Sequence, residues 1–317
     1  MGNRKRLFAN IMDICYSTVD WYFSDMRRDR LLSCRQSGPP GLHEDIKVMM
    51  VKNKNKIVIV IPAYNPDEKM TAFLQDLKDA GYTQIIVTDD GSLQDARRFF
   101  TAAREDFGCK IVSHSINLGQ GRTYKTAFNY FLSETGKGGR FSQAVGIIQC
   151  DCDGQHHVDD IDRCAELLCA NPGKFILGVR DFSDRAIPFR SRFGNRVTSF
   201  VFRIFAGMDL EDTQSGLRGI PAFFIPVLME VPGERFEYAS SCLLAAKKHK
   251  IEILQFPIRT IYINKNETSH FRPVKDSIRI YSLLFEQLFK QLLPLTVFVI
   301  GIAVSRRMFH LPGKIPF

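Results

Sequence analysis

The chain has 317 residues, of which 45% are hydrophobic and 24% are charged, and these proportions exclude a disordered chain and favour one large folded domain or two small ones. A net charge of +9 predicts an anionic partner, which could be nucleic acid, a phosphorylated substrate or an anionic membrane surface. Because no arginine-rich run alternates with aromatic residues and no zinc-finger or basic-zipper pattern occurs, we expect no nucleic-acid partner.

The first 55 residues predict an amphipathic helix followed by a linker. Between Leu7 and Phe23, polar residues recur at alternating steps of three and four and leave a broad apolar face. This face could pack on the protein's own core or, with Arg4-Lys5-Arg6 before it, on a membrane surface. Asp13 and Asp20 interrupt the apolar stretch, so we expect no secretory signal. Together with eight scattered cysteines, this favours a reducing cytosolic setting.

From Lys56 onward, short β-branched runs alternate with amphipathic stretches. The expected strands are IVIVIPAY, QIIVTDD, KIVSHS, AVGIIQCDCD and FILGVR, and the expected helices lie near residues 69–80, 94–107, 122–132 and 158–169. Apolar strands separated by helices predict an α/β fold in which a parallel sheet carries helices on both faces. A Phe-rich helix over residues 193–205 follows, and its apolar spacing favours a core helix over a lipid groove.

Polar residues cluster where the expected strands end. Ligands of open α/β sheets bind outside the carboxyl ends of the strands, and four such ends are expected to meet at one edge. They carry Ala63-Tyr64-Asn65, Asp89-Asp90-Gly91-Ser92, Asn117-Leu118-Gly119 and Asp151-Cys152-Asp153. Taken alone, the second motif is typical of a helix-capping turn, and the third, with the arginine after it, is a weak phosphate-binding signal. Together with the acidic fourth motif, they favour a nucleotide site.

The fourth strand end, CDCDGQHH over residues 150–157, offers both thiols and carboxylates. The side-chain period of a strand places Asp151 and Asp153 on one side and the two cysteines on the other. Because unpaired carboxylates are costly to bury, we expect them to face the cleft. No CxxC pair completes a zinc site, whereas carboxylate and amide oxygens suit Mg²⁺ or Mn²⁺. Asp153 and Gln155 are the expected direct ligands, with Asp151 nearer the nucleotide, and the two histidines are expected in a loop or at a helix start.

A series of eight motifs follows in order between Lys56 and Leu284: IPAYN, VTDDGS, NLGQGRTYKTA, DCDGQH, RSRFGNRVTSF, QSGLRG, FEY and SHFRPVKDS. This series resembles the family-2 glycosyltransferases of the GT-A fold, especially the polyprenyl-phosphate glycosyltransferases of the dolichyl-phosphate mannose synthase type. The resemblance implies a Rossmann-like α/β domain over residues 56–270, with a mixed, mostly parallel sheet flanked by helices. Amphipathic helices would precede and follow it.

The resemblance also implies roles for individual residues. Those expected to bind the nucleotide sugar are Pro62, Ala63, Tyr64, Asn65, Asp89, Asp90, Asn117, Gly119, Arg122, Asp151 and Cys152. Those expected to form the metal-and-diphosphate signature are Asp151, Asp153 and Gln155. The acceptor phosphate is expected at Arg180, Ser191 and Arg192, with Arg218 beside the donor diphosphate. Gln120 stands where many relatives carry a basic residue, so part of the donor recognition differs from theirs.

The implied reaction moves a sugar, with inversion, from a nucleoside-diphosphate sugar to undecaprenyl or dolichyl phosphate, while Mg²⁺ or Mn²⁺ and arginines neutralise the departing diphosphate. Asp153 and Arg218 would then be catalytic. An ionised phosphate acceptor needs no general base, whereas a hydroxyl acceptor on a glycolipid or polysaccharide needs one, for which Glu237 and Asp212 are the candidates. Both acids could equally pair with neighbouring arginines. A non-catalytic nucleotide-sugar-binding protein is the alternative from another class.

Residues 271–317 predict a segment at a membrane surface. One helical face carries Arg279, Ser282, Glu286 and Lys290 while leucines and a phenylalanine fill another, which is typical of an interfacial helix. The apolar run Leu292–Val304 is shorter than the roughly 20 residues of a spanning helix. With Arg306-Arg307 behind it, this run predicts a peripheral or shallowly inserted enzyme at the cytoplasmic face of the membrane. Alternatively, the segment packs on the domain or on a second subunit of a homo-oligomer.

Overall fold

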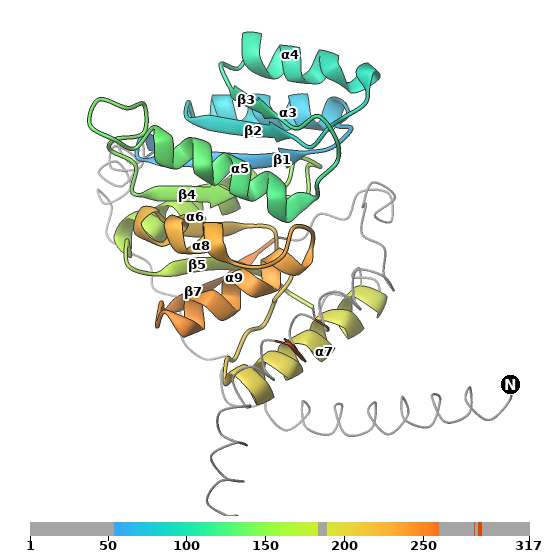
Figure 1. The fold of residues 1–317 in the computed structure, drawn as a ribbon, viewed down its shortest axis with the longest axis vertical. Helices are drawn as coiled ribbons and strands as arrows, with labels where there is room; N and C mark the ends of the chain where they lie inside the picture. The colour runs from blue at the N-terminus through green and yellow to red at the C-terminus, as the bar shows by residue number, and fades with distance from the viewer. Residues whose placement is uncertain (1–53, 183–188, 260–281, 283–284, 287–317) are drawn as a thin grey trace, which may run out of the picture. The chain divides into compact units, whose positions relative to one another are not determined.

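The computed structural model describes residues 54–182 and 189–259 and the isolated positions 282, 285 and 286 (Figure 1), all of which belong to one compact unit. The expected N-terminal helix, the linker, the SHFRPVKDS motif and the apolar run near the C-terminus lie outside these residues and stay predictions. Within the described residues, no helix is long and apolar enough to cross a membrane.

A seven-stranded sheet forms the centre of this unit, in the order β3-β2-β1-β4-β6-β5-β7. Its strands are β1 (Ile57–Ala63), β2 (Ile85–Asp89), β3 (Lys110–Ser113), β4 (Gly146–Gln149), β5 (Phe175–Arg180), β6 (Arg218–Pro221) and β7 (Ile253–Ile258). Only β6 runs antiparallel to its neighbours, β4 and β5. The alternation pattern alone predicted a parallel sheet and missed β6 and β7, whereas the mixed, mostly parallel sheet implied by the family resemblance is confirmed.

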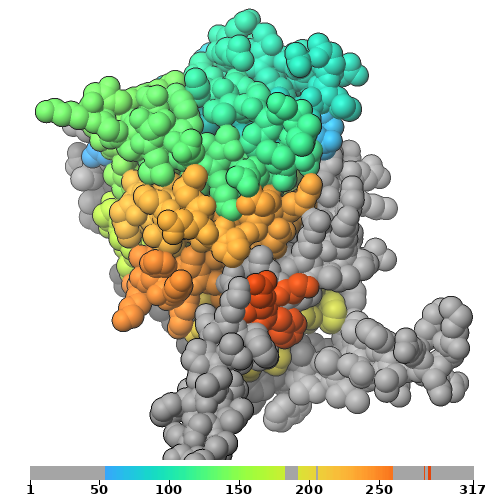
Figure 2. All heavy atoms as spheres, in the orientation of Figure 1, coloured from blue at the N-terminus to red at the C-terminus, as the bar shows by residue number. Residues whose placement is uncertain are grey.

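Helices cover both faces of the sheet. They are α3 (Glu68–Asp79), α4 (Arg97–Glu105) after the 3₁₀ turn η2 (Gln94–Ala96), α5 (Gln120–Ser133), α6 (Val158–Ala170), α7 (Phe189–Ala206), α8 (Ile225–Glu230) after the 3₁₀ turn η3 (Ala222–Phe224), and α9 (Glu237–Lys248). In the space-filling view, α8 and α9 lie directly against α5 (Figure 2). The predicted helices are confirmed to within three residues at their ends, except that α7 begins four residues before the predicted start at 193. Their apolar spacing is a local property of the sequence.

Strand β1 illustrates how the two cores arise, since its side chains alternate between them. Val58 and Val60 pack with α5, α8 and α9 on one face, while the isoleucines at 57, 59 and 61 pack with α3, α4 and α6 on the other. Every residue from Ile57 to Ile61 is fully buried. A strand buried on both faces reads as an uninterrupted apolar run rather than an alternating one, as IVIVI does.

The Phe-rich helix α7 is a core helix on only one of its faces. Asn195, Thr198 and Phe202, at helical spacing, are buried, but Phe200 and Ile204 are 41% and 59% exposed. The expectation that the apolar residues of this helix fill the core is therefore wrong for these two. At 100° per residue, 18 residues present every direction around the axis, and only one face of α7 meets the domain.

Candidate active site

The polar motifs meet at one edge of the sheet, here called the carboxyl edge, where the parallel strands end. Ala63 pairs with Asp89 and Asp89 pairs with Ser113, so β1, β2 and β3 end level with one another. Because β6 is antiparallel, its first residue, Arg218, lies at the same edge opposite Gln149, the last residue of β4. The predicted convergence of strand ends is confirmed, and β6 adds a fifth element to it.

The acidic loop, residues 150–157, begins where β4 ends. The expectation that the strand continues through Asp153 is wrong, because β4 ends at Gln149 and Gly154 takes a positive φ of 77°. The side-chain directions are nevertheless as predicted for the thiols. Cys150 is fully buried among α3 and α6 and Cys152 packs against the same core, while both aspartates keep partial exposure.

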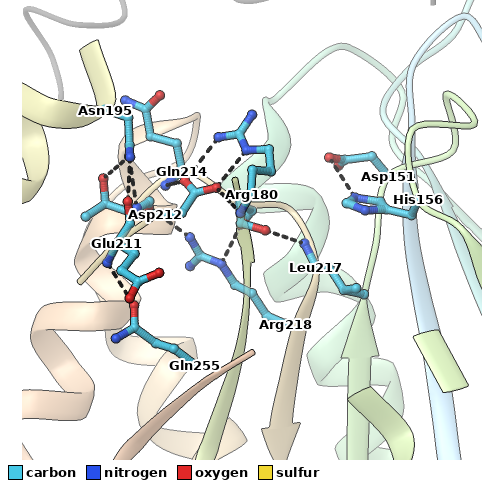
Figure 3. Close-up of polar contacts among 12 residues, drawn as sticks. Asp151, His156, Arg180, Asn195, Glu211, Asp212, Gln214, Leu217, Arg218 and Gln255 are labelled. Atoms are coloured by element: carbon cyan, nitrogen blue, oxygen red, sulfur yellow. Dashed lines mark hydrogen bonds and ion pairs between the residues drawn. The ribbon is translucent and has the colours of Figure 1, made fainter. Parts of the chain in front are cut away.

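Asp151 is held by neighbours from three segments. Gln120 Nε2 donates to its Oδ1 at 3.1 Å, and His156 Nε2 lies 3.7 Å from its Oδ2 (Figure 3). Gly216 approaches so closely that a Cβ built on it would collide with the Asp151 carboxylate. Burial alone would raise the pKa of Asp151, but His156 and the positive charges of Arg218 and Arg180 outweigh it, so the pKa lies below its ordinary value.

Asp153 has the opposite electrostatic character. Its Oδ1 accepts a hydrogen bond from the Gln155 backbone N–H at 3.0 Å, which closes a tight turn. Burial, and then the negative charge of Asp151, raise the pKa of the Asp153 carboxyl. Oxygen ligands of this kind suit a hard divalent cation. Within the described residues, no group of three or more His, Cys, Asp or Glu side chains forms a metal site.

The loops that follow β1 and β2 are tied together by Asn65. This residue takes a positive φ of 49°, which asparagine tolerates better than most residues. Its backbone N–H donates to Ser92 Oγ at 2.9 Å, and its Oδ1 accepts from the Leu93 N–H at 2.8 Å. Asp89 Oδ1 accepts from the Ser92 N–H at 2.8 Å. Asn65 and Asp89 thus shape the edge, with Pro62, Ala63 and Tyr64 beside them, and their contact with a nucleotide stays a prediction.

Asp90 is buried and its carboxylate is fully engaged. Asn117 Nδ2 and the Gly119 N–H donate to its Oδ2 at 2.9 and 2.8 Å, and the Leu118 N–H donates to its Oδ1 at 2.9 Å. His114 Nδ1 lies 2.8 Å from the same Oδ1. An ionised carboxylate accepts about four hydrogen bonds, so Asp90 has no acceptor position left for a sugar or base. It anchors the loop that carries Asn117 and Gly119.

The N-terminus of α5 is packed against the loop between α8 and α9, here called the Glu234 loop (residues 231–236). Glu234 pairs with Arg122 Nε at 2.6 Å and with Lys125 Nζ at 2.9 Å. A Cβ at Gly119 or Gly121 would clash with the backbone of this loop. Arg122, expected at the donor phosphates, is thus ion-paired with Glu234, although half of its side chain remains exposed.

A bidentate ion pair joins the end of β5 to the segment before β6. Arg180 Nε donates to Asp212 Oδ2 at 2.6 Å and its Nη2 donates to Oδ1 at 3.0 Å (Figure 3). The backbone N–H groups of Gln214 and Arg180 add two further donors to Asp212, at 3.0 and 3.3 Å. The Asp212 side chain is fully buried, while that of Arg180 is 23% exposed. The sequence allowed Asp212 to be either a general base or the ion-pair partner of an arginine. This geometry favours the ion pair.

Arg218 is fully buried. Its guanidinium donates to the backbone carbonyls of Ser215, Ala239 and Thr213 at 2.9, 2.7 and 3.2 Å. It therefore holds residues 213–215 against α9. Its effect on the acidic loop is electrostatic, since its charge lowers the pKa of Asp151. This arrangement does not support the expected direct contact with a diphosphate.

The remaining predicted residues lie on α7 and α9. Ser191 and Arg192 are in the first turns of α7, and Arg192 is half-buried, whereas the Ser191 side chain is outside the described set. Glu237 Oε1 accepts from the backbone N–H groups of Glu234 and Arg235, both at 3.2 Å. Glu237, the first residue of α9, thus holds the end of the Glu234 loop against the start of the helix.

Several residues of the site were not assigned a role from the sequence. They are His114, Lys125, Asn195, Glu234 and Arg235, together with Gly216. Asn195 on α7 donates to the Glu211 carbonyl at 2.6 Å and accepts from the Thr213 N–H at 3.1 Å. Three of them, Lys125, Asn195 and Gly216, lie inside quoted motifs, so a motif residue without an obvious role was a usable signal. The others have partners far along the chain and left no local signal.

The mixed α/β sheet, with acidic and basic residues at its carboxyl edge, is the arrangement that the resemblance to GT-A glycosyltransferases implied. The chain matches the model of glycosyl transferase family 2 over residues 58–224 and belongs to this family. It is therefore a glycosyltransferase, as the motifs predicted. The non-catalytic alternative has no support from this assignment.

The chain is similar to two archaeal proteins over most of their lengths. An uncharacterized protein of Methanocaldococcus jannaschii is 28% identical over 75% of this chain and 94% of that protein. The UDP-N-acetylglucosamine–dolichyl-phosphate N-acetylglucosaminyltransferase of Methanococcus voltae is 27% identical over 65% of this chain and 86% of that protein. Among solved structures, glucosyl-3-phosphoglycerate synthase from Mycobacterium tuberculosis, in complex with Mn²⁺ and UDP, has a TM-score of 0.56 at 12% identity and covers 80% of this chain and 86% of that one. The structural match shows a shared fold.

Proposed function

We propose that this glycosyltransferase moves a sugar from a nucleoside-diphosphate sugar to a polyprenyl phosphate at the cytoplasmic face of a membrane, with Mg²⁺ or Mn²⁺ at the acidic loop. The observation that carries the proposal is the pair of carboxylates, Asp151 and Asp153, at the carboxyl edge of the sheet. Burial and the charge of Asp151 raise the pKa of Asp153, so a bound cation would favour its ionised form.

The donor set of the acidic loop fits a hard divalent cation. Asp151, Asp153 and the amide oxygen of Gln155 are the candidate ligands, and Mg²⁺ or Mn²⁺ commonly takes one or two carboxylates and fills its other positions with phosphates and water. When bound, such an ion neutralises negative charge that develops on the departing diphosphate. The chain itself contributes the buried positive charge of Arg218, which already lowers the pKa of Asp151 and keeps it ionised for the metal.

The acceptor assignment rests on the state of the two candidate bases. Asp212 is fully buried and binds Arg180 through both oxygens, and Glu237 Oε1 caps two backbone amides. Both carboxylates thus accept hydrogen bonds from groups within the protein. A hydroxyl acceptor would need a free base, whereas a lipid phosphate is ionised and attacks without one. The geometry therefore supports a phosphate acceptor.

Helix α7 supports a membrane setting. Phe200 and Ile204 are exposed, and the helix contains four arginines and no acidic residue in the sequence FRSRFGNRVTSFVFRIFA. An exposed apolar strip beside basic residues is typical of a helix that lies on an anionic lipid surface. The Methanococcus voltae relative, whose name specifies a dolichyl-phosphate acceptor, supports the same assignment.

The test is a donor screen with the full-length protein, membrane lipid extract and Mn²⁺, in which radiolabelled sugar is followed into an organic phase. Asp153→Asn and Asp151→Asn should each slow transfer by about 100-fold or more, since each removes charge from the metal site. Asp76→Asn, the same change on the exposed side of α3, is the matched control. Label found only in free sugar or in aqueous polymer would reject the lipid-phosphate acceptor. Full activity of both Asp151→Asn and Asp153→Asn would reject the metal site.

A further inference from the structure

His114 joins two elements of the donor side through both of its ring nitrogens. It directly follows β3, and its backbone N–H donates to the Asp89 carbonyl at 2.8 Å. Nδ1 lies 2.8 Å from Asp90 Oδ1, and Nε2 lies 2.8 Å from Thr126 Oγ1 on α5. Since an ionised carboxylate can only accept, Nδ1 carries the hydrogen in this arrangement. The His114 side chain is only 8% exposed, so no ligand competes for either contact.

The Asp90 carboxylate, which His114 contacts, also holds residues 117–119 of the loop before α5. The His114 and Leu118 donors share Oδ1, while the Asn117 amide and the Gly119 N–H share Oδ2. All four donors lie between 2.8 and 2.9 Å. Because bonds to one buried charge reinforce each other, loss of one donor leaves its oxygen with a single hydrogen bond and loosens the remaining contacts.

The loop fixed in this way carries the first residue of α5 to the acidic loop. Gly119 directly precedes Gln120, whose amide donates to Asp151 Oδ1 at 3.1 Å. The contact between His114 and Thr126 holds the second turn of the same helix. Two points therefore fix α5: Gly119, bonded to Asp90, and Thr126, bonded to His114.

We propose that His114 is a positioning residue for sugar transfer, which holds Asp90, the loop 117–119 and the start of α5 in the geometry that aims Gln120 at Asp151. In this assignment Asp90 also positions the loop and does not bind the nucleotide itself. The inference rests on the proposed function, because it takes Asp151 as a donor-site residue.

The experiment compares substitutions that keep one of the two imidazole contacts. The amide nitrogen of His114→Asn reaches the place of Nδ1 and retains the bond to Asp90, whereas His114→Gln places its amide near Nε2 and loses that bond. Thr126→Val removes only the second contact. Binding of UDP, GDP, CDP, dTDP and ADP, each with Mn²⁺, is measured by calorimetry on the full-length variants, and the nucleotide that binds the wild type is then used throughout.

His114→Gln and His114→Ala should weaken nucleotide binding by about tenfold, the effect of one lost hydrogen bond to a buried charge, while His114→Asn stays within about threefold of the wild type. Amide exchange at residues 117–119 should rise in the first two variants only. Tyr82→Phe is the matched control, since Tyr82 donates to Asp162 at 2.7 Å before β2, at the opposite edge of the sheet. It should lower stability without changing nucleotide binding.

Equal binding by the Asn and Gln variants, or equal weakening in Tyr82→Phe, would overturn the positioning role and leave the proposed function intact. If the Ala variant does not fold, the Asn and Gln pair decides by the same criterion. A wild-type protein that binds none of the five nucleotides would overturn the proposed function and this inference with it.

Discussion

Arg218 offers a direct choice between a structural role and a phosphate-binding role. The sequence motif predicted a contact with the donor diphosphate, but the side chain is fully buried and donates to three backbone carbonyls. In Arg218→Met the length of the side chain is kept while all three donors and the charge are lost. We expect a large loss of stability and a secondary loss of activity.

The magnitude follows from the three carbonyls. A buried acceptor that loses its donor costs about 1–3 kcal/mol, so three such acceptors cost about 3–9 kcal/mol. Methionine carries no charge, so the variant no longer pays the free energy of burying one, and this offsets part of the loss. A net loss of about 3–5 kcal/mol is a large fraction of the 5–15 kcal/mol typical of a domain. At about 2–4 °C for each kcal/mol in a domain of this size, Tm should fall by roughly 6–20 °C.

Urea unfolding followed by far-ultraviolet circular dichroism measures this loss. Arg98→Met is the control, because it removes the same side-chain donors and charge from an exposed position. Arg98 pairs with Glu68 but its side chain is 71% exposed, and such a pair contributes at most about 1 kcal/mol. If Arg218→Met unfolds at the same urea concentration as the control yet binds nucleoside diphosphate much more weakly, the reasoning is refuted, and Arg218 acts on the diphosphate directly.

Three further predictions concern the acceptor, the acidic loop and the membrane surface. Glu237→Gln should slow transfer by less than about threefold if the acceptor is a phosphate, because the amide oxygen can still accept from the Glu234 and Arg235 N–H groups. A loss of about 100-fold or more, the scale of general-base catalysis, would indicate a hydroxyl acceptor. Gly216→Ala should weaken Mn²⁺-dependent donor binding by about tenfold or more, because a Cβ there meets the Asp151 carboxylate and displaces a proposed metal ligand. The control is Gly136→Ala, where a Cβ meets nothing within 4 Å. Unchanged donor binding in Gly216→Ala would disprove the close approach. Replacing both Phe200 and Ile204 by Ser should reduce co-sedimentation with phosphatidylglycerol vesicles by about tenfold or more, because apolar burial in the lipid is lost. Phe223→Ser, at a residue that is 56% exposed at the opposite edge of the sheet, should not reduce it. Equal losses would argue against α7 as the membrane-binding element.

The order of strands and helices along the chain was readable from local patterns. IVIVI predicted a strand buried on both faces, and the apolar spacing of α3 and α5 predicted their lengths, because each signal lies within one element. Strand β6 was missed because RGIP is short, begins with an arginine and contains a single isoleucine. Its conformation depends on pairing with β4 and β5 on its two sides, which are distant in sequence.

The sequence alone also determined which residues gather at the carboxyl edge, since parallel strands with polar ends must bring those ends together. It did not determine what those residues do there. Asp90, Arg122 and Arg218 all have the chemistry to bind a nucleotide or a phosphate, and each has its charge occupied within the protein. A charged group must find a partner when it is buried, and that partner lies 29 residues away for Asp90 and more than 100 away for the α5 cations. Such pairings exist only once the chain has folded, so the tertiary structure decided which polar residues hold the site together and which remain available for substrate.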